Sequence, residues 1–216
     1  MGLYLDSAGL DDAVAAAALG FVRGITTNPA LMRKETADPL RHLRDLLAAV
    51  ELPEVYYQPT GAYGPPGAAA EEAEEAWSAD KDRVVLKLPA TPDGAALAGT
   101  LTRRGARVAL TAAQTPHAML VAESMGCAAV IPYLDRAVRD LRTDSELIRS
   151  LAGLRRGSTR VIAASVKNSG QVLHAFASGA DAVTAPLAVL RELLSHPASI
   201  EAEQAFAQEY ASTAKG

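Results

Sequence analysis

The sequence predicts a protein of the α/β class, a (β/α)8 TIM barrel with an extra C-terminal helix. Short β-prone runs alternate with longer segments whose apolar residues recur at helical spacing, and the alternation repeats eight times within 216 residues. Several helical segments open with a capping residue and close at a glycine. The competing fold is a doubly wound open sheet, but no G-x-G-x-x-G sequence follows a predicted strand.

The predicted elements follow one another in strict alternation. Strands are predicted at residues 3–6, 24–27, 55–58, 84–88, 107–111, 129–133, 161–165 and 182–184. Helices are predicted between and after them at residues 10–19, 39–49, 68–78, 94–104, 115–126, 145–155, 169–178 and 187–195. Helix starts are indicated by Asp11, Asp38, Thr91, Thr115, Asp144 and Asn168, and helix ends by Gly20, Gly105, Gly126 and Gly179.

Two segments fall outside this alternation. A further helix is predicted at about residues 198–212, where it would dock either on the barrel or on a neighbouring subunit. Residues 59–67 (PTGAYGPPG) form a Gly/Pro-rich stretch that we interpret as a long loop after the third strand, since the alternation continues beyond it. No domain boundary is evident, so residues 1–216 are predicted to form one domain.

The composition limits the classes of function. A net charge of −4 gives no support to a nucleic-acid partner, and no apolar stretch approaches the length that spans a membrane. The N-terminal sequence does not resemble a signal peptide, so a cytoplasmic location is expected. The single cysteine, Cys127, excludes a disulfide framework and is expected to be buried. The four histidines lack the spacing of metal ligands, so no metal is predicted. No other cofactor is expected.

Polar residues end every predicted strand, where (β/α)8 barrels collect their chemistry. They are Asp6, Thr26, Thr27, Asn28, Gln58, Lys87, Thr111, Tyr133, Ser165 and Thr184.

Lys87 stands out because it interrupts the apolar run VVLKLP. Burial disfavours the ammonium form and lowers the pKa of a lysine, and the neutral amine is the form that attacks a carbonyl to make a Schiff base. The alternative is that Lys87 lies at a frayed strand end and reaches solvent, and the local sequence does not decide between the two. Among the other lysines only Lys167 competes for this role.

The neighbouring strand ends offer groups that could assist. Asp6 could transfer protons or bind a substrate hydroxyl, or it could cap the following helix. Gln58, Thr111 and Tyr133 could together hold a water molecule for the proton transfers of imine chemistry, although each alone is an ordinary polar residue near a loop.

A second polar group lies on and after the sixth and seventh strands. Arg136, Ser165 and Lys167 combine two cations and a hydroxyl beside a predicted helix start, which could bind a phosphate. Arg136 could instead form a surface ion pair with Asp135 or Asp140.

Six segments of the chain resemble the transaldolase family in the expected order. They are LYLDSA, GITTNPALM, VVLKLPAT, VALTAAQ, VIPYLDR and AASVKN, and the resemblance runs from about residue 3 to the C-terminal helix. The short chain resembles the small-subunit branch, which includes fructose-6-phosphate aldolase. The resemblance implies a metal-free class I mechanism on a (β/α)8 barrel and homo-oligomers, often rings of five or ten subunits.

The resemblance also implies a role for each matching residue. Lys87 matches the imine-forming lysine, Asp6 the acid–base carboxylate and Thr111 the threonine that helps to hold the catalytic water. Two residues match those that hydrogen-bond substrate hydroxyls, and three match the phosphate-binding set: Thr26 and Asn28, and Arg136, Ser165 and Lys167, respectively.

Two positions bear on the reaction. Transaldolases typically carry Glu and Phe where this chain has Gln58 and Tyr133, and the chain resembles the aldolase branch at both. A tyrosine hydroxyl that orients water favours hydrolysis of the imine, so we predict an aldolase that uses dihydroxyacetone as donor and a phosphorylated aldehyde as acceptor. The alternatives are a transaldolase that passes the three-carbon unit between sugar phosphates, and a non-catalytic barrel that binds a sugar phosphate. Residues 59–67 match neither branch, which leaves the substrate open.

Overall fold

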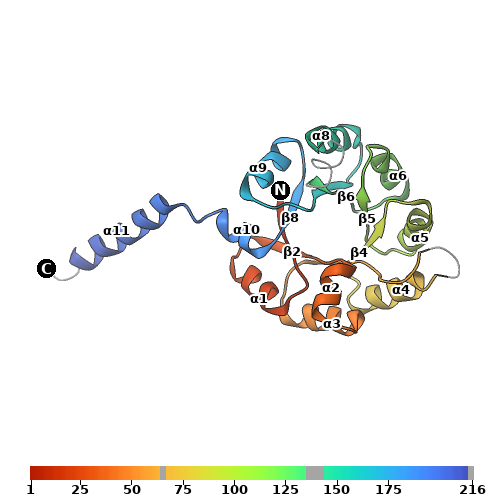
Figure 1. Ribbon diagram of the computed structural model, residues 1–216, viewed down its shortest axis with the longest axis horizontal. Helices are drawn as coiled ribbons and strands as arrows, with labels where there is room; N and C mark the ends of the chain where they lie inside the picture. The colour runs from red at the N-terminus through yellow and green to blue at the C-terminus, as the bar shows by residue number, and fades with distance from the viewer. Residues whose placement is uncertain (64–66, 135–143, 214–216) are drawn as a thin grey trace.

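The computed structural model describes residues 1–63, 67–134 and 144–213. Within them, eight parallel strands close into a barrel in the order of the chain, with β1 paired to both β2 and β8 (Figure 1). The strands are β1 Gly2–Asp6, β2 Val22–Thr26, β3 Glu54–Tyr57, β4 Val84–Pro89, β5 Val108–Ala113, β6 Ala129–Pro132, β7 Arg160–Ala163 and β8 Ala182–Ala185. The predicted (β/α)8 fold is thus confirmed.

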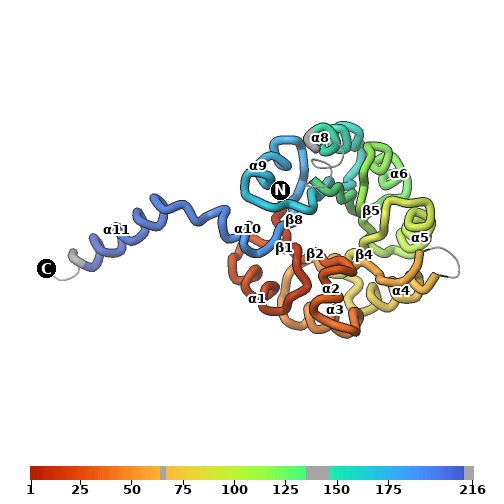
Figure 2. The backbone as a smooth tube through the Cα atoms, in the orientation of Figure 1, coloured from red at the N-terminus to blue at the C-terminus, as the bar shows by residue number. Residues whose placement is uncertain are grey.

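Most of the helices form a ring outside the strands, and α11 lies beyond it, as the backbone trace makes clear (Figure 2). They are α1 Leu10–Ala18, α2 Pro29–Glu35, α3 Pro39–Ala49, α4 Ala69–Ala79, α5 Pro92–Arg103, α6 His117–Met125, α8 Asp144–Leu154, α9 Ser169–Ala177, α10 Leu187–Glu192 and α11 Pro197–Thr213. All eight predicted strands and all nine predicted helices have a counterpart, with boundaries that differ by a few residues.

Most of the predicted helix boundaries have the expected chemistry. The side chains of Asp38, Thr91 and Asn168 each accept a hydrogen bond from a backbone N–H in the first turn of the helix that follows. Asp11 and Thr115 do not cap, because the N-caps of α1 and α6 are Gly9 and Pro116, respectively. The four predicted glycine ends are left-handed, with φ of 75°, 93°, 71° and 99° at Gly20, Gly105, Gly126 and Gly179.

Within the described residues, one helix was not predicted. α2 follows β2 directly, and Asn28 caps it by accepting hydrogen bonds from the backbone N–H groups of Ala30 and Leu31, each at 3.0 Å. Pro29 occupies the first turn, where its missing N–H costs nothing. The Asn-Pro pair was a usable signal, but seven residues with one buried side chain carry little helical periodicity.

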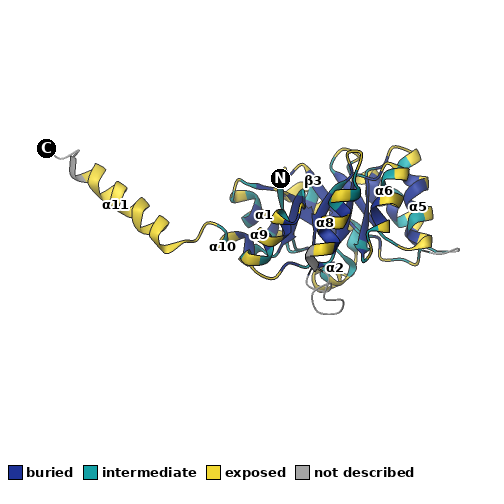
Figure 3. Ribbon diagram, turned by 90° about the horizontal axis from the view of Figure 1, so that it is seen from above, coloured by how far each residue is buried: buried dark blue, intermediate teal, exposed yellow. Residues whose placement is uncertain are grey.

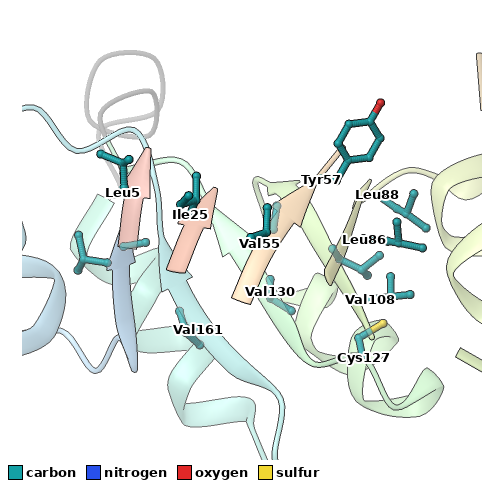
Figure 4. Close-up of a cluster of buried hydrophobic side chains, with 14 of the residues drawn as sticks. Leu5, Ile25, Val55, Tyr57, Leu86, Leu88, Val108, Cys127, Val130 and Val161 are labelled. Atoms are coloured by element: carbon teal, nitrogen blue, oxygen red, sulfur yellow. The ribbon is translucent and has the colours of Figure 1, made fainter. Parts of the chain in front are cut away.

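The hydrophobic core has two layers, because strand side chains alternate between the helices and the barrel interior. Figure 4 shows part of the outer layer, in which Val55 and Tyr57 of β3 face the same side as Leu86 and Leu88 of β4. The intervening Tyr56 belongs to the inner cluster, which also holds Tyr4, Val85, Ile131 and Ile162. Large apolar and aromatic side chains therefore fill the middle of the barrel beneath its mouth.

An ionic network lies at the N-terminal ends of the strands. The Glu54 carboxylate accepts hydrogen bonds from the hydroxyls of Tyr4 at 2.6 Å and Tyr56 at 2.9 Å, and it pairs with Arg160 at 3.0 Å and with Arg107. Burial raises the pKa of Glu54, but these donors outweigh it and lower the pKa below its usual value. The network closes the floor of the barrel, at the end opposite to the predicted chemistry.

The C-terminal helix extends away from the barrel (Figures 1 and 3). Phe206 and Tyr210 of α11 are 70% and 79% exposed, and Ile200 is 44% exposed. None of the helices described is long and apolar enough to cross a lipid bilayer.

Candidate active site

A cavity of about 530 Å³ opens at the carboxyl ends of the strands. It is lined by residues from β1, β4 and the segments after β2, β3, β6 and β7, which are far apart in the sequence. Seven of the ten predicted site residues line it: Asp6, Asn28, Gln58, Lys87, Tyr133, Ser165 and Lys167. Parallel strands bring their carboxyl ends to one face, which is why these residues meet.

Lys87 lies inside β4 and is only 3% exposed. Its Nζ donates a hydrogen bond of 2.7 Å to the backbone carbonyl of Thr27, which follows β2. Burial lowers the pKa of Lys87 to about 8, although the nearby Asp6 carboxylate raises it. The alternative of a solvated lysine at a frayed strand end is therefore wrong. At any given pH, a larger fraction of this amine is therefore neutral than for an exposed lysine.

Asp6 ends β1 and is held by a chain of hydroxyls. Thr26 donates a hydrogen bond of 3.1 Å to Oδ1 of Asp6, and the hydroxyls of Thr26 and Thr184 lie 2.6 Å apart. Because Thr26 has one hydrogen, donation to Asp6 leaves Thr184 as the donor to Thr26. Asp6 does not cap the following helix, since the N-cap residue of α1 is Gly9.

Thr26 and Thr184 lie behind Asp6 and do not line the cavity. Thr26 was predicted to contact substrate, but it is completely buried and its hydroxyl hydrogen-bonds to Asp6. Thr184, for which the sequence indicates no role, is 1% exposed and lies behind Thr26. Only the closure of β8 onto β1 brings these residues together, and no local sequence signal indicates it.

Asn28 reaches the cavity from the start of α2. Its carbonyl oxygen accepts hydrogen bonds from the two backbone N–H groups that it caps, so the donor that the side chain can offer a ligand is its amide NH2. A donor in this position suits a substrate hydroxyl or carbonyl oxygen.

Thr111 lies in β5, and Gln58 and Tyr133 directly follow β3 and β6. Thr111 is completely buried, and its hydroxyl lies 3.5 Å from that of Tyr133, at the limit of a hydrogen bond. Within the described residues, the buried Oε1 of Gln58 accepts no hydrogen bond. A buried polar atom of this kind normally has a partner, and water is the commonest one when protein groups supply none.

Two cavity residues have left-handed backbones without being glycine. Ala112 in β5 has φ of 56° and Ser165 has φ of 62°. Such conformations cost energy and are concentrated at functional sites. At Ala112 the register between β5 and β6 shifts, so the strand bends where it borders the cavity.

The predicted phosphate site is described in part. Ser165 is half-buried and Lys167 is exposed, and both line the cavity just before α9 begins. Arg136, Asp135 and Asp140 lie outside the described residues.

Two further sequence expectations concern reactive groups. Cys127 is 2% exposed, and burial raises the pKa of its thiol to about 11, as expected of a structural cysteine. The residues that the structure describes contain no group of three or more His, Cys, Asp or Glu side chains that could hold a metal ion.

A closed (β/α)8 barrel with a polar cavity at the carboxyl ends of its strands has the architecture of a barrel enzyme. Comparison with known proteins identifies which kind. Residues 66–215 match the model of the family described as Transaldolase/Fructose-6-phosphate aldolase, and the chain belongs to this family.

Relatives along the whole chain support the assignment. A probable transaldolase of Symbiobacterium thermophilum is 33% identical over 100% of this chain and 99% of its own. A probable transaldolase of Desulfatibacillum aliphaticivorans is 31% identical over 100% of both chains, and one of Roseiflexus sp. is 33% identical over 91% of each. The protein is thus an enzyme of the transaldolase-family aldolase type.

Proposed function

We propose that the protein is a class I aldolase that cleaves or forms a ketose phosphate such as fructose 6-phosphate, with dihydroxyacetone as the three-carbon unit. The observation that carries the proposal is Lys87, a 3% exposed amine whose pKa is lowered to about 8 by burial, in a cavity that also contains a carboxylate. A neutral amine in a closed site is the nucleophile that a Schiff-base mechanism requires.

The proposed reaction begins when neutral Nζ of Lys87 attacks the ketone carbon of the sugar. Loss of water from the adduct gives an iminium ion, which withdraws electrons from the neighbouring carbon–carbon bond. Asp6 accepts the proton of the hydroxyl next to that bond, the bond breaks, and the phosphorylated aldehyde leaves. The hydroxyl chain from Thr184 through Thr26 supports this role by holding the carboxylate in place.

Cleavage leaves the three-carbon unit on Lys87 as an enamine, whose carbon takes back a proton from Asp6 to give an iminium ion. Hydrolysis of this iminium ion distinguishes an aldolase from a transaldolase. Gln58, Thr111 and Tyr133 supply a buried carbonyl oxygen and two hydroxyls that could hold one water molecule between them. In the proposed mechanism this water transfers protons as the carbinolamine forms and breaks down. Dihydroxyacetone is then released into solution and is not transferred from Lys87 to an acceptor aldehyde.

The phosphate end of the substrate is proposed to bind Ser165 and Lys167, with Arg136 as a third member of the set. The first two line the cavity beside the N-terminus of α9, whose N–H groups favour an anion. A sugar phosphate or free dihydroxyacetone is accordingly the proposed small-molecule partner.

A coupled assay with fructose 6-phosphate, run with and without erythrose 4-phosphate, tests the reaction. The proposal predicts release of dihydroxyacetone without an acceptor. Turnover only when the acceptor is present would instead establish the transaldolase alternative. Stabilisation by sugar phosphates with no turnover in either assay would support the non-catalytic barrel.

We further propose that the protein is a homo-oligomer in the cytoplasm, as a ring of five or ten subunits in line with its family. The exposed apolar side chains of α11 support assembly. A helix in a protein gains most of its stability by packing an apolar face, and a neighbouring subunit could provide that packing for α11. Subcellular fractionation tests the location.

A further inference from the structure

We infer that Gln171 is a positioning residue that holds Lys167 at the cavity and thereby sets the preference of the enzyme for a phosphorylated substrate. Gln171 lies in the first turn of α9, outside the segments whose sequence resembles the transaldolase family, and it has no part in the proposed function. The inference rests on that function, because it concerns the phosphate that Lys167 is proposed to bind.

Hydrogen bonds in opposite directions join Gln171 to the residues just before α9. Its backbone N–H donates to Oδ1 of Asn168, the N-cap residue, at 2.9 Å. Its side-chain Oε1 accepts from the backbone N–H of Lys167 at 2.7 Å. A backbone N–H can only donate, so the oxygen end of the amide must face Lys167. The pair resembles a capping box whose returning bond reaches the residue before the N-cap.

The turn between β7 and α9 contains a strained residue, Ser165, that needs support from both sides. Its left-handed backbone, with φ of 62°, costs energy for a residue with a Cβ and persists only where neighbouring contacts fix it. On one side, Ala164 makes backbone hydrogen bonds of 2.9 and 2.8 Å at the end of β6. On the other, Val166 is 1% exposed within the outer core layer. Gln171 supplies the next anchor, at Lys167.

Lys167 depends on this anchor for its place. It is exposed and lines the cavity, and within the described part of the chain its ammonium forms no ion pair. Its backbone N–H has no partner there other than Gln171. Because a lysine carries its charge on a long flexible stem, the position of the backbone decides whether the ammonium reaches the cavity.

The effect of Gln171 on the substrate must pass through Lys167, because Gln171 does not line the cavity. A fixed backbone limits the space that the ammonium explores, which lowers the entropy lost when it binds a ligand. The gain is large for a phosphate, which pairs with the ammonium as an ion, and small for a neutral hydroxyl in the same place. Gln171 should therefore favour phosphorylated substrates over unphosphorylated ones.

The test is Gln171→Leu, assayed in the direction of synthesis with dihydroxyacetone as the donor. The acceptor is either glyceraldehyde 3-phosphate or glyceraldehyde, and kcat and KM are measured for each. The KM for glyceraldehyde 3-phosphate is expected to rise about fivefold, the order expected for one lost hydrogen bond, while kcat stays within about twofold. The kcat/KM for glyceraldehyde is expected to stay within about twofold, because glyceraldehyde has no charge for Lys167 to bind.

Two comparisons separate positioning from a general structural effect. In a Lys167→Met background, which lacks the ammonium, Gln171→Leu is expected to change the preference for the phosphorylated acceptor by less than about twofold. Ser169→Ala is the matched control, because it removes a hydrogen bond of 2.7 Å to Glu192 from the same turn of α9 without touching Lys167. It should leave the preference unchanged. All these variants should trap dihydroxyacetone on Lys87 at the wild-type rate, which verifies that the barrel is folded.

The possible failures are distinct. A wild-type enzyme that prefers the phosphorylated acceptor, with a Gln171→Leu variant that keeps this preference, would overturn the positioning role alone. An equal fall in the Lys167→Met background would do the same, because the effect would not pass through the ammonium. A wild-type enzyme that uses both acceptors equally would overturn the proposed phosphate site, and one that forms no product with either would overturn the proposed function. This inference would fall with both.

Discussion

Lys87 illustrates how a strand interior alters a side chain. Its stem is surrounded by the barrel, and its Nζ reaches a single carbonyl, that of Thr27. Solvation of the ammonium is thereby lost and only partly replaced, so the pKa falls to about 8 from 10.5. The Asp6 carboxylate raises the pKa of Lys87 and so limits this shift.

The lowered pKa predicts the pH dependence of imine formation. Only the neutral amine attacks, so the rate of forming the Lys87 adduct should rise about tenfold per pH unit and level off near pH 8. Asp6→Asn should move this limb to lower pH, because the carboxylate that raises the pKa is gone. Adduct formation with dihydroxyacetone and cyanoborohydride, followed by mass spectrometry from pH 6 to 10, measures both. A limb near pH 10.5, or an upward shift in Asp6→Asn, would contradict the account.

Among the elements, β3 contributes to both ends of the barrel. It begins at Glu54, in the ionic floor, and ends beside Gln58, at the mouth. β2 accommodates the floor with Gly24, since a Cβ there would lie 2.2 Å from the Glu54 carbonyl and 3.0 Å from the Tyr4 ring. Floor and mouth are separated by the inner apolar cluster, so stability and chemistry should be separable.

Glu54→Gln tests that separation. Loss of the charge leaves Arg160 and Arg107 without their carboxylate, and should lower the free energy of unfolding by about 2–3 kcal/mol. Because the pKa of Glu54 is lowered on folding, its stabilisation is present above the unfolded pKa near 4.5 and is lost as pH falls through the folded value. Urea unfolding at pH 7 and pH 4 checks this: the difference between variant and wild type should shrink at pH 4.

The kcat of Glu54→Gln should stay within about twofold of the wild-type kcat under conditions where the variant is folded, because Glu54 lies at the end of the barrel opposite to the cavity. A variant whose urea midpoint equals that of the wild type would contradict the stabilising role of the floor. A variant that is folded but inactive would contradict the separation of floor and mouth.

The sequence predicted the elements better than it predicted their contacts. The eight strands, the glycine ends and Lys87 each leave a local pattern, because alternation, left-handed turns and a charge in an apolar run are visible in a few residues. The hydroxyl chain from Thr184 to Asp6 depends on register and closure, which no short pattern contains. α2 was missed because its single buried residue, Met32, sets no period.

At the scale of the whole molecule, the barrel and α11 differ in character. The barrel buries its two apolar layers within one chain, whereas α11 leaves Ile200, Phe206 and Tyr210 exposed. Exposed apolar side chains on a helix that extends from the fold are typical of a surface that another subunit covers.

Removal of residues 197–216 should therefore lower the oligomeric state and leave the barrel folded. Light scattering after size-exclusion chromatography measures the mass, and circular dichroism checks the fold. A full-length protein that is monomeric, or a truncated one that keeps the full oligomeric mass, would contradict the role of α11.

The central claim is that Lys87 forms the imine, and reductive trapping tests it most directly. The protein is treated with dihydroxyacetone and borohydride, digested, and analysed by mass spectrometry, with Lys87→Arg and Lys167→Arg as paired variants. The account predicts one reduced dihydroxyacetone on Lys87 in the wild type and in Lys167→Arg, and none in Lys87→Arg. Trapping on Lys167, or no adduct on Lys87 at pH 8, would contradict it.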